Sequence, residues 1–279
     1  MGNARLDHGA QFFTVRGDDF RATIDEAQQD GVVDIWCHGF DGDDGYPRYY
    51  CPGGMTSLAK WLASHVEASG GRITLGDRVS KVSQDDRGWR LPLESGGELS
   101  AQQLLITAPV PQTLDLLNDG EVVLEPAQRS ELEAITYVRT IGVLATLDGP
   151  PSIPAPGGIQ HGPDEVFSFI SDNQQKGVSS EPAVTFHANN TLSEDRWNDA
   201  EDVVLADLLE EAKPWLGDAN VIAAQLKKWK YAGPRKPHED RSFTLATEPG
   251  LLVLAGDAFG GPKVEGAFNS GLAAADVLR

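Results

Sequence analysis

The sequence predicts a mixed α/β fold that contains more than one domain. Its 279 residues exceed the usual size of one compact domain, which predicts either one large domain or two interleaved ones. The five consecutive apolar residues at 251–255 are typical of a parallel strand that is buried on both faces. Along the rest of the chain, segments with helical spacing and segments of strand character are separated by Gly, Asp and Pro turns.

The first third of the chain predicts two helices and a strand. Residues 18–29 have helical spacing that ends at an Asp-Gly stop, and residues 32–36 read as an apolar strand. Thr56 is a natural N-cap for a second helix, which ends at the glycine pair 70–71. The predicted apolar stripe of this helix consists of Leu58, Trp61, Leu62 and Val66.

The rest of the chain alternates predicted strands and helices. Strands are predicted at 73–84, 88–94, 98–109, 138–149, 166–171, 183–188, 223–232 and 251–257. Helices are predicted at 112–117, 125–135, 200–216 and from Val264 onward. The residues of the helix at 200–216 that are expected to be buried are Val203, Leu205, Leu208 and Leu209.

Charge and cysteine content exclude several classes of function. The chain carries 23 Lys and Arg against 42 Asp and Glu, and the resulting formal charge of −19 repels nucleic acids and anionic membranes. The two cysteines, Cys37 and Cys51, have no regularly spaced His or Cys partners, so no metal site is predicted. The sequence has no secretory pattern and no apolar run of bilayer length, which predicts a cytoplasmic protein without nucleic-acid or membrane partners.

The end of the last predicted strand has the features of a ligand site. Gly256 lets a ligand approach the backbone, and Asp257 places a carboxylate at the carboxyl end of the strand, where open α/β sheets bind ligands. After a turn at 260–262, a helix begins whose free N–H groups and dipole favour an anion. An acid that only ends the strand in a turn is the alternative interpretation of Asp257.

The run GDAFGGPKVEGAFNSGLAAA at 256–275 resembles the end of flavin amine-oxidase-type enzymes, and it is especially similar to bacterial renalase-like proteins. The resemblance implies FAD as the cofactor. It implies that Asp257 contacts the ribityl and pyrophosphate part of FAD. It also implies that the helix start lies against the pyrimidine edge of the flavin, through Glu265, Gly266 and Ala267.

Other segments extend the resemblance over essentially the whole chain. The segment DHGAQFF implies that Gln11 and Phe12 lie beside the flavin, although Gln11 could also be an ordinary exposed amide. The segment PGGMTSLAKWLA implies that Gly54 and Met55 lie near the active site. The segment GDRVSKV implies that the backbone at Val79 holds the adenine.

The resemblance implies a two-domain FAD-oxidoreductase fold. The expected FAD-binding domain comprises residues 1–14, 52–112 and 246–279, and the expected antiparallel-sheet substrate domain comprises residues 15–51 and 113–245. Family members begin with a strand, a G-x-G-x-x-G turn, a helix and a second strand, and nothing in the printed sequence matches this unit. The Rossmann-like FAD domain is therefore expected to be incomplete, and a late-called start codon, a truncated gene and a degenerate protein remain open as reasons.

Three side chains are candidates for the substrate site. His187 lies inside an apolar strand, and a hydrogen-bonded core histidine is the alternative interpretation. Trp229 and Tyr231 are two residues apart, so they project from one face of a strand and could wall a pocket or pack in the core. The catalytic residues themselves are left unassigned.

The sequence thus predicts an FAD-dependent oxidoreductase. The resemblance implies hydride transfer from a reduced nitrogenous small molecule, either a dihydronicotinamide isomer or an amine, to the flavin, with reoxidation by oxygen. The alternative is a flavin-less remnant that acts as a binding or oligomerising protein, dimerising through an open sheet edge. The substrate, the electron acceptor and the oligomeric state are left open.

Overall fold

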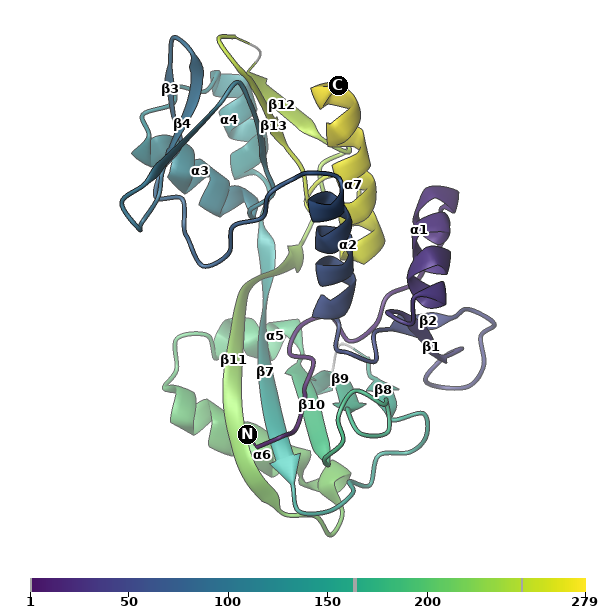
Figure 1. Cartoon of the computed structure of the whole chain (residues 1–279). Coiled ribbons are helices and arrows are strands. Elements are labelled where there is room, and N and C mark those ends of the chain that lie inside the picture. The colour runs from purple at the N-terminus through teal and green to yellow at the C-terminus, as the bar shows by residue number, and fades with distance from the viewer. Residues whose placement is uncertain (1, 163–164, 247) are drawn as a thin grey trace. The chain divides into compact units, whose positions relative to one another are not determined.

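The computed structural model describes residues 2–162, 165–246 and 248–279. The chain divides into two compact units, of which unit 1 comprises Met1–Gly70 and Val138–Ala232 and unit 2 comprises Gly71–Tyr137 and Gly233–Arg279. Helices alternate with several antiparallel sheets, which confirms the predicted mixed α/β class (Figure 1).

The bounds of the two units differ from the predicted domains. Residues 1–14 and 52–70, which were assigned to the FAD-binding domain, fall in unit 1, and residues 113–137 and 233–245, which were assigned to the substrate domain, fall in unit 2. Units of dense packing need not coincide with the domains that carry a function. The predicted domain boundaries therefore stay a prediction.

A five-stranded sheet with the strand order β11-β7-β10-β9-β8 lies at the centre of unit 1. Its strands are β7 (Tyr137–Leu147), β8 (Gly158–Gln160), β9 (Phe167–Asp172), β10 (Ala183–Ala188) and β11 (Val221–Pro234). Strand β10 runs antiparallel to both of its neighbours, and Phe186 lies opposite Val143 and Ile170. The strands predicted at 138–149, 166–171, 183–188 and 223–232 are thereby confirmed.

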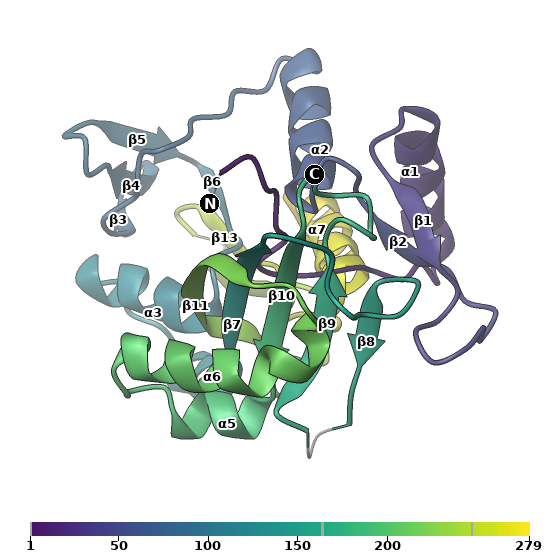
Figure 2. The same ribbon diagram turned by 90° about the horizontal axis from the view of Figure 1, so that it is seen from below.

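Two helices, α5 (Asn190–Asp195) and α6 (Glu201–Leu216), cover one face of this sheet (Figure 2). Helix α6 buries one residue per turn against β7 and β10, at Val204, Leu208, Ala212 and Leu216. The prediction that Val203 is buried was wrong, because the i, i+4 stripe starts one residue later and leaves Val203 50% exposed. Leu205 and Leu209 lie at the edge of the stripe and are partly buried.

The N-terminal segment is held in unit 1 by the buried residue Asp7. The Asp7 carbonyl accepts a hydrogen bond from Thr185 Oγ1 at 3.0 Å, and the Asp7 N–H donates to Asn173 Oδ1 at 3.2 Å. One carboxylate oxygen lies 2.8 Å from Nζ of Lys176, whose side chain is 0% exposed. The other accepts the backbone N–H of Met55 at 2.8 Å. Asp7 therefore joins three distant parts of the chain.

The remaining elements of unit 1 are α1 (Asp18–Gln29), β1 (Asp34–Cys37), β2 (Arg48–Tyr50) and α2 (Thr56–Ala68). Helix α1 has the predicted bounds and buries Phe20, Ile24 and Ala27. The predicted apolar stripe of α2 is only partly confirmed, because Leu58 is buried whereas Val66 is 49% exposed.

A three-stranded sheet in unit 2 has the order β12 (Phe243–Ala246), β13 (Leu251–Leu254), β6 (Gln103–Ile106). Strand β13 runs parallel to β6 and antiparallel to β12, as its continuous apolar sequence predicts. Helix α7 (Lys263–Leu278) packs on β13 through Ala274, which contacts Val253 and Ala255. The small side chain of Ala274 lets the helix approach the sheet closely.

The second sheet of unit 2 contains β3 (Ser83–Asp85), β4 (Gly88–Pro92) and β5 (Glu98–Ala101), and the unit also contains α3 (Val110–Asp119) and α4 (Pro126–Glu133). The strand predicted at 73–84 was wrong over most of its length. Val79 forms only an isolated bridge with Leu93, and Gly76 has a φ of +73°. In the described chain, residues 73–78 have no partner strand to take their ladder hydrogen bonds, so they do not form a strand.

Replacing Lys176 with Met is expected to lower the free energy of unfolding by about 3–5 kcal/mol, because it leaves the Asp7 carboxylate buried without its cation. Urea denaturation measures the change. The double variant D7N/K176M removes both charges and is expected to be more stable than K176M. K60M changes an exposed lysine of α2 and is the control; equal stability of K176M and K60M would contradict the role of the pair.

Candidate active site

Strand β13 ends at a glycine whose backbone is open on one side. Gly256 has a φ of +138°, which side-chain-bearing residues adopt only with strain. Its N–H donates to Oγ of the buried Ser270 of α7 at 2.9 Å. A Cβ added at Gly256 would meet nothing nearer than the Thr107 carbonyl oxygen at 3.6 Å. The space beside this backbone is therefore free for a ligand.

Asp257 follows directly and is partly buried. Burial raises the pKa of its carboxyl group, although the N–H groups of Asp257 and Ala258 partly offset this effect by donating to the carboxylate. A carboxylate at the carboxyl end of a parallel strand can accept hydrogen bonds from ligand hydroxyl groups. The position agrees with the role predicted for Asp257, which stays a prediction.

The first turn of α7 begins beside the glycine turn at 260–262. The helix follows Pro262, which provides no side-chain cap, so its first N–H groups are not satisfied by a capping side chain. A Cβ at Gly266 would lie 1.9 Å from the Gly261 carbonyl oxygen, so the close approach of the turn requires glycine there. Glu265, Gly266 and Ala267 thus lie in a helix start that suits an anion or a carbonyl-rich ring edge.

The loop after Asp257 is braced by His238. The His238 N–H donates to the Ala258 carbonyl at 2.7 Å, and His238 forms a parallel bridge with Phe259. The Phe259 side chain is 1% exposed, and its ring centroid lies 6.0 Å from that of His238 and 6.4 Å from that of Phe243. These contacts hold the backbone of the loop against residues 238 and 243.

Val79, the predicted adenine contact, also belongs to unit 2. It is partly buried, and its antiparallel bridge with Leu93 continues into a hydrogen bond from the Ser80 N–H to the Pro92 carbonyl at 2.9 Å. Its backbone is thus ordered by β4 and the residues that follow it. The contact with adenine stays a prediction.

Unit 1 contains a cavity of about 370 Å³ beside its central sheet. The cavity is lined by Gly9, Ala10, Thr140, His187, Trp229, Tyr231 and Ala232. All three predicted substrate-site residues therefore line one cavity, and no carboxylate is among the lining residues. On β7 and β10 the residues of the opposite parity, such as Ile141 and Phe186, point into the core against α6.

The ring of His187 presents an unprotonated nitrogen. Burial lowers the pKa of His187 to about 4, so the imidazole is neutral near pH 7. The ring donates a hydrogen bond to the His8 carbonyl, and its Nε2 atom is buried without a partner among the described residues. The proton is therefore assigned to Nδ1, and Nε2 is a hydrogen-bond acceptor to which no described residue donates.

The His8 carbonyl also positions Trp229. Trp229 Nε1 donates to this carbonyl at 2.8 Å, and the His8 ring stacks on the indole with centroids 5.3 Å apart. One backbone carbonyl thereby orients both His187 and Trp229, and Tyr231 follows two residues later on the same strand. The alternative that Trp229 lies in the core is not supported, because Trp229 is 38% exposed.

Gln11 is buried, so the alternative of an exposed amide was wrong. Its side-chain amide nitrogen donates to the Asp7 carbonyl at 2.6 Å and to the Gly9 carbonyl at 3.0 Å, which determines the amide orientation. Its Oε1 atom is buried without a partner among the described residues. The neighbouring Phe12 packs against Phe40 with centroids 5.0 Å apart. Oε1 is thus a second acceptor for a ligand donor.

Gly54 and Met55 lie at the start of α2 in unit 1. Gly54 has a φ of +89°, and a Cβ there would lie 3.3 Å from Asp7 Oδ1, so glycine keeps room for the Asp7 carboxylate. The Met55 N–H donates to the same oxygen. The structure gives both residues a role in holding Asp7, and their predicted place beside the flavin stays a prediction.

Sequence reasoning missed the polar partners of these residues. Thr140 lies in β7 and lines the cavity, and its hydroxyl in a mostly apolar strand is the signal that could have revealed it. Lys176 was also missed, because its partner Asp7 lies 169 residues away. Nothing in the local sequence links these two residues.

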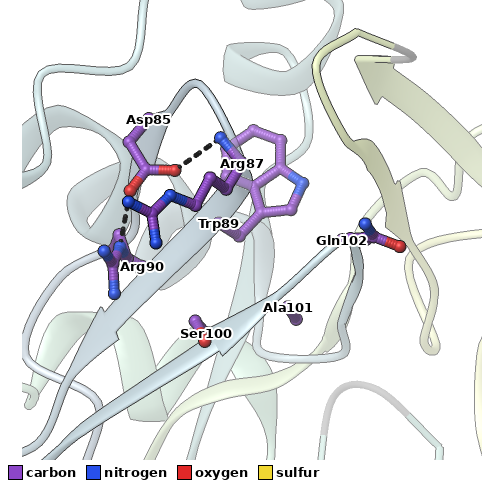
Figure 3. Close-up of a pocket in the computed structure, with 7 residues that line it drawn as sticks. All are labelled: Asp85, Arg87, Trp89, Arg90, Ser100, Ala101 and Gln102. Atoms are coloured by element: carbon purple, nitrogen blue, oxygen red, sulfur yellow. Dashed lines mark hydrogen bonds and ion pairs between the residues drawn. The ribbon is translucent and has the colours of Figure 1, made fainter.

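A second hollow, of about 180 Å³, lies on the β3-β4-β5 sheet of unit 2 (Figure 3). The Asp85 carboxylate accepts hydrogen bonds there from Arg90 Nε at 2.7 Å and from the Arg87 N–H at 2.8 Å. Arg90 also pairs with Glu98 at 2.9 Å, so its charge is compensated within the protein. The hollow contains no predicted site residue, and we assign it no chemistry.

Neither a metal cluster nor a membrane helix is found in the described part of the chain. No group of three or more His, Cys, Asp or Glu side chains there is arranged to hold a metal ion. Among the same residues, no helix has the length and apolar character needed to cross a bilayer.

Replacing Ser270 with Ala is expected to lower the free energy of unfolding by about 1–3 kcal/mol, because the Gly256 N–H loses its acceptor in a buried site. Thermal denaturation followed by circular dichroism measures the loss. S130A changes an exposed serine of α4 and is the control. A wild-type melting temperature for S270A would show that the hydrogen bond does not brace the end of β13.

The lowered pKa of His187 predicts a pH dependence of stability. Between the ordinary pKa of about 6.5 and the folded value of about 4, the unfolded chain binds more protons at this residue, so the contribution of His187 to stability is lost as the pH falls. The free energy of unfolding of wild type is expected to fall more steeply from pH 7 to pH 4.5 than that of H187Q. H65Q, which alters an exposed histidine, is the control substitution, and equal slopes for H187Q and wild type would contradict the role of His187.

Known proteins resemble this chain over most of its length. The family described as flavin containing amine oxidoreductase matches residues 7–279. Renalase from Mus musculus is 23% identical over 249 residues, which cover 86% of this chain and 72% of renalase.

Solved structures share the fold. An oxidoreductase from Methanosarcina mazei has a TM-score of 0.62 at 16% identity, over 83% of this chain and 56% of its own length. A redesigned putrescine oxidase has a TM-score of 0.56 at 16% identity, over 84% of this chain and 54% of its own. The chain thus spans about half the length of these structures. This family indicates FAD as the cofactor. Because the family match extends over residues 7–279, the chain belongs to the flavin-containing amine oxidoreductase family.

Proposed function

We propose that the protein is an FAD-dependent oxidoreductase of renalase-like type that oxidises a reduced nitrogenous small molecule. The cavity of unit 1 holds the substrate, and a dihydronicotinamide isomer fits it better than an amine does. The observation that carries this proposal is the buried, unpartnered Nε2 of a neutral His187 in a cavity walled by Trp229 and Tyr231.

The residues present fit a flavin dinucleotide. In unit 2, the open backbone at Gly256, the Asp257 carboxylate and the uncapped start of α7 offer groups for a ribityl chain, a phosphate and a ring edge. Bound FAD would supply a hydride acceptor for the substrate, with oxygen as the oxidant that regenerates it and is reduced to hydrogen peroxide.

The chemistry of the cavity favours a neutral substrate with an N–H donor. Nε2 of His187 can accept a hydrogen bond from a carboxamide N–H, whereas a protonated amine would need a carboxylate, and none lines the cavity. The flat faces of Trp229 and Tyr231 suit a planar ring. These features support a dihydronicotinamide.

The side chains of the cavity would orient the substrate and exclude water. His187 holds the substrate carboxamide by one hydrogen bond, and Trp229 is kept in place by the His8 carbonyl. The Thr140 hydroxyl offers a second polar contact. None of these groups has to move a proton, because the oxidation of a dihydronicotinamide transfers a hydride.

The proposed function is tested by the flavin spectrum. The protein is incubated with FAD, freed of excess cofactor and mixed anaerobically with dihydronicotinamide isomers or with amines. Flavin absorbance that is bleached by a dihydronicotinamide isomer and restored by air is the expected result. H187A is expected to slow the bleaching about tenfold or more, because the substrate N–H loses its acceptor, and H187Q less so.

H65A, in an exposed part of α2, is the matched control and is expected to bleach at the wild-type rate. A protein that stays colourless after incubation with FAD would contradict the proposal. That result would favour the flavin-less alternative. In the described chain, strand β6 pairs with β13 on one side and with no strand on the other, so it offers an open sheet edge for dimerisation. Sedimentation of a stable oligomer without cofactor would then support that alternative.

A further inference from the structure

Strand β11 carries a run of lysines beside the cavity of unit 1. Lys227, Lys228 and Lys230 occur within four residues of a chain whose formal charge is −19. So strong a negative charge repels anionic ligands, and local cations weaken that repulsion where an anion binds. The position of these lysines is therefore informative about the substrate.

The alternation of β11 places Lys227 on the same face as the cavity residues. Successive side chains of a strand point to opposite faces, so Lys227, Trp229 and Tyr231 share one face, with neighbours about 7 Å apart. Trp229 and Tyr231 line the cavity, and Lys227 is exposed one step beyond them. Its ammonium group is thus within reach of the rim.

Lys230 starts from the opposite face of β11, the face of Lys228, but β11 is an edge strand and the Lys230 side chain reaches back to the ring of Tyr231. Its Nζ atom lies 5.2 Å from the centroid of the Tyr231 ring, a wall of the cavity. Lys228, by contrast, is occupied on the other face, where its Nζ donates to the Trp197 carbonyl at 2.9 Å and lies 3.7 Å from Glu201. Neither Lys227 nor Lys230 forms an ion pair with any residue that the structure describes.

The size of the cavity indicates what these cations meet. A cavity of about 370 Å³ is near the lower limit for small-molecule sites, so it holds one substituted ring and leaves any longer substituent outside. No carboxylate lines the cavity to repel an anion at its mouth. A substituent that leaves the cavity over β11 would therefore pass the two ammonium groups.

We propose that Lys227 and Lys230 form a cationic rim that binds the phosphate of a reduced nicotinamide nucleotide and so makes the enzyme prefer nucleotides to the unphosphorylated nucleoside. The inference rests on the proposed function, since it assumes that the ring enters the cavity. Each lysine acts as a hydrated point charge on a flexible stem, which suits a phosphate of variable position.

The test compares three substrates with the same reduced ring: the riboside, the mononucleotide and the dinucleotide. At low ionic strength, kcat/KM of wild type is expected to be about three- to tenfold higher for the two phosphorylated substrates than for the riboside. The double variant K227Q/K230Q is expected to lose this preference while it keeps the riboside rate. Added salt is expected to weaken the preference in wild type.

K60Q/K213Q, which removes two exposed lysines of α2 and α6, is the charge-matched control and is expected to keep the preference. A preference that persists in K227Q/K230Q, or equal kcat/KM for all three substrates in wild type, would overturn the proposal. A riboside preferred to the mononucleotide would do the same. Circular dichroism verifies that the double variant is folded.

Binding separates this inference from the proposed function. The quenching of tryptophan fluorescence by the oxidised mononucleotide and riboside measures affinity without any turnover. Turnover of all three substrates without a phosphate preference would refute the rim and leave the function standing. The protein could instead bind the mononucleotide through Lys227 and Lys230 and turn over none of the substrates. That result would refute the function, whereas the rim would stand as a nucleotide-binding site.

Discussion

The buried ion pair between Asp7 and Lys176 holds the N-terminal segment on the central sheet of unit 1, and the candidate substrate site depends on it. The pair is desolvated, so its attraction is offset by the cost of burying two charges, and it is stable only because backbone groups complete the hydrogen bonding of Asp7. Burial lowers the pKa of Lys176, and the nearby carboxylate opposes that shift. With Asp7 in place, the next residue presents its carbonyl to both His187 and Trp229.

This arrangement produces an unusual acceptor. An imidazole whose Nδ1 is committed to a backbone carbonyl and whose surroundings disfavour protonation keeps its other nitrogen free for a ligand. The amide of Gln11 is oriented in the same way, because two backbone carbonyls take its N–H groups and leave Oε1 free. Both devices rest on the backbone of the N-terminal segment. Although the protein has 42 acidic residues, no carboxylate is among the residues that line the cavity.

Unit 2 uses backbone groups in place of charged side chains. The glycine at the end of β13, the uncapped first turn of α7 and the tight turn before it present N–H groups and open space, and Ser270 and His238 hold this backbone from two sides. Backbone N–H groups at the start of a helix suit an anion or a polar ring edge. The geometry of this site depends on packing, because the small side chain of Ala274 lets α7 lie against Val253 and Ala255.

The sequence by itself determined the mixed α/β class, the bounds of helix α1, the parallel buried strand β13 and the membership indicated by the segment at 256–275, because all of these follow from local spacing or from contiguous motifs. It also placed His187, Trp229 and Tyr231 as candidates. Only the tertiary structure decided that they line one cavity, that Gln11 is buried and that Lys176 pairs with Asp7. Those facts depend on the strand order and on contacts between residues up to 169 positions apart. They also depend on how burial changes the protonation of a side chain. The local sequence encodes none of these.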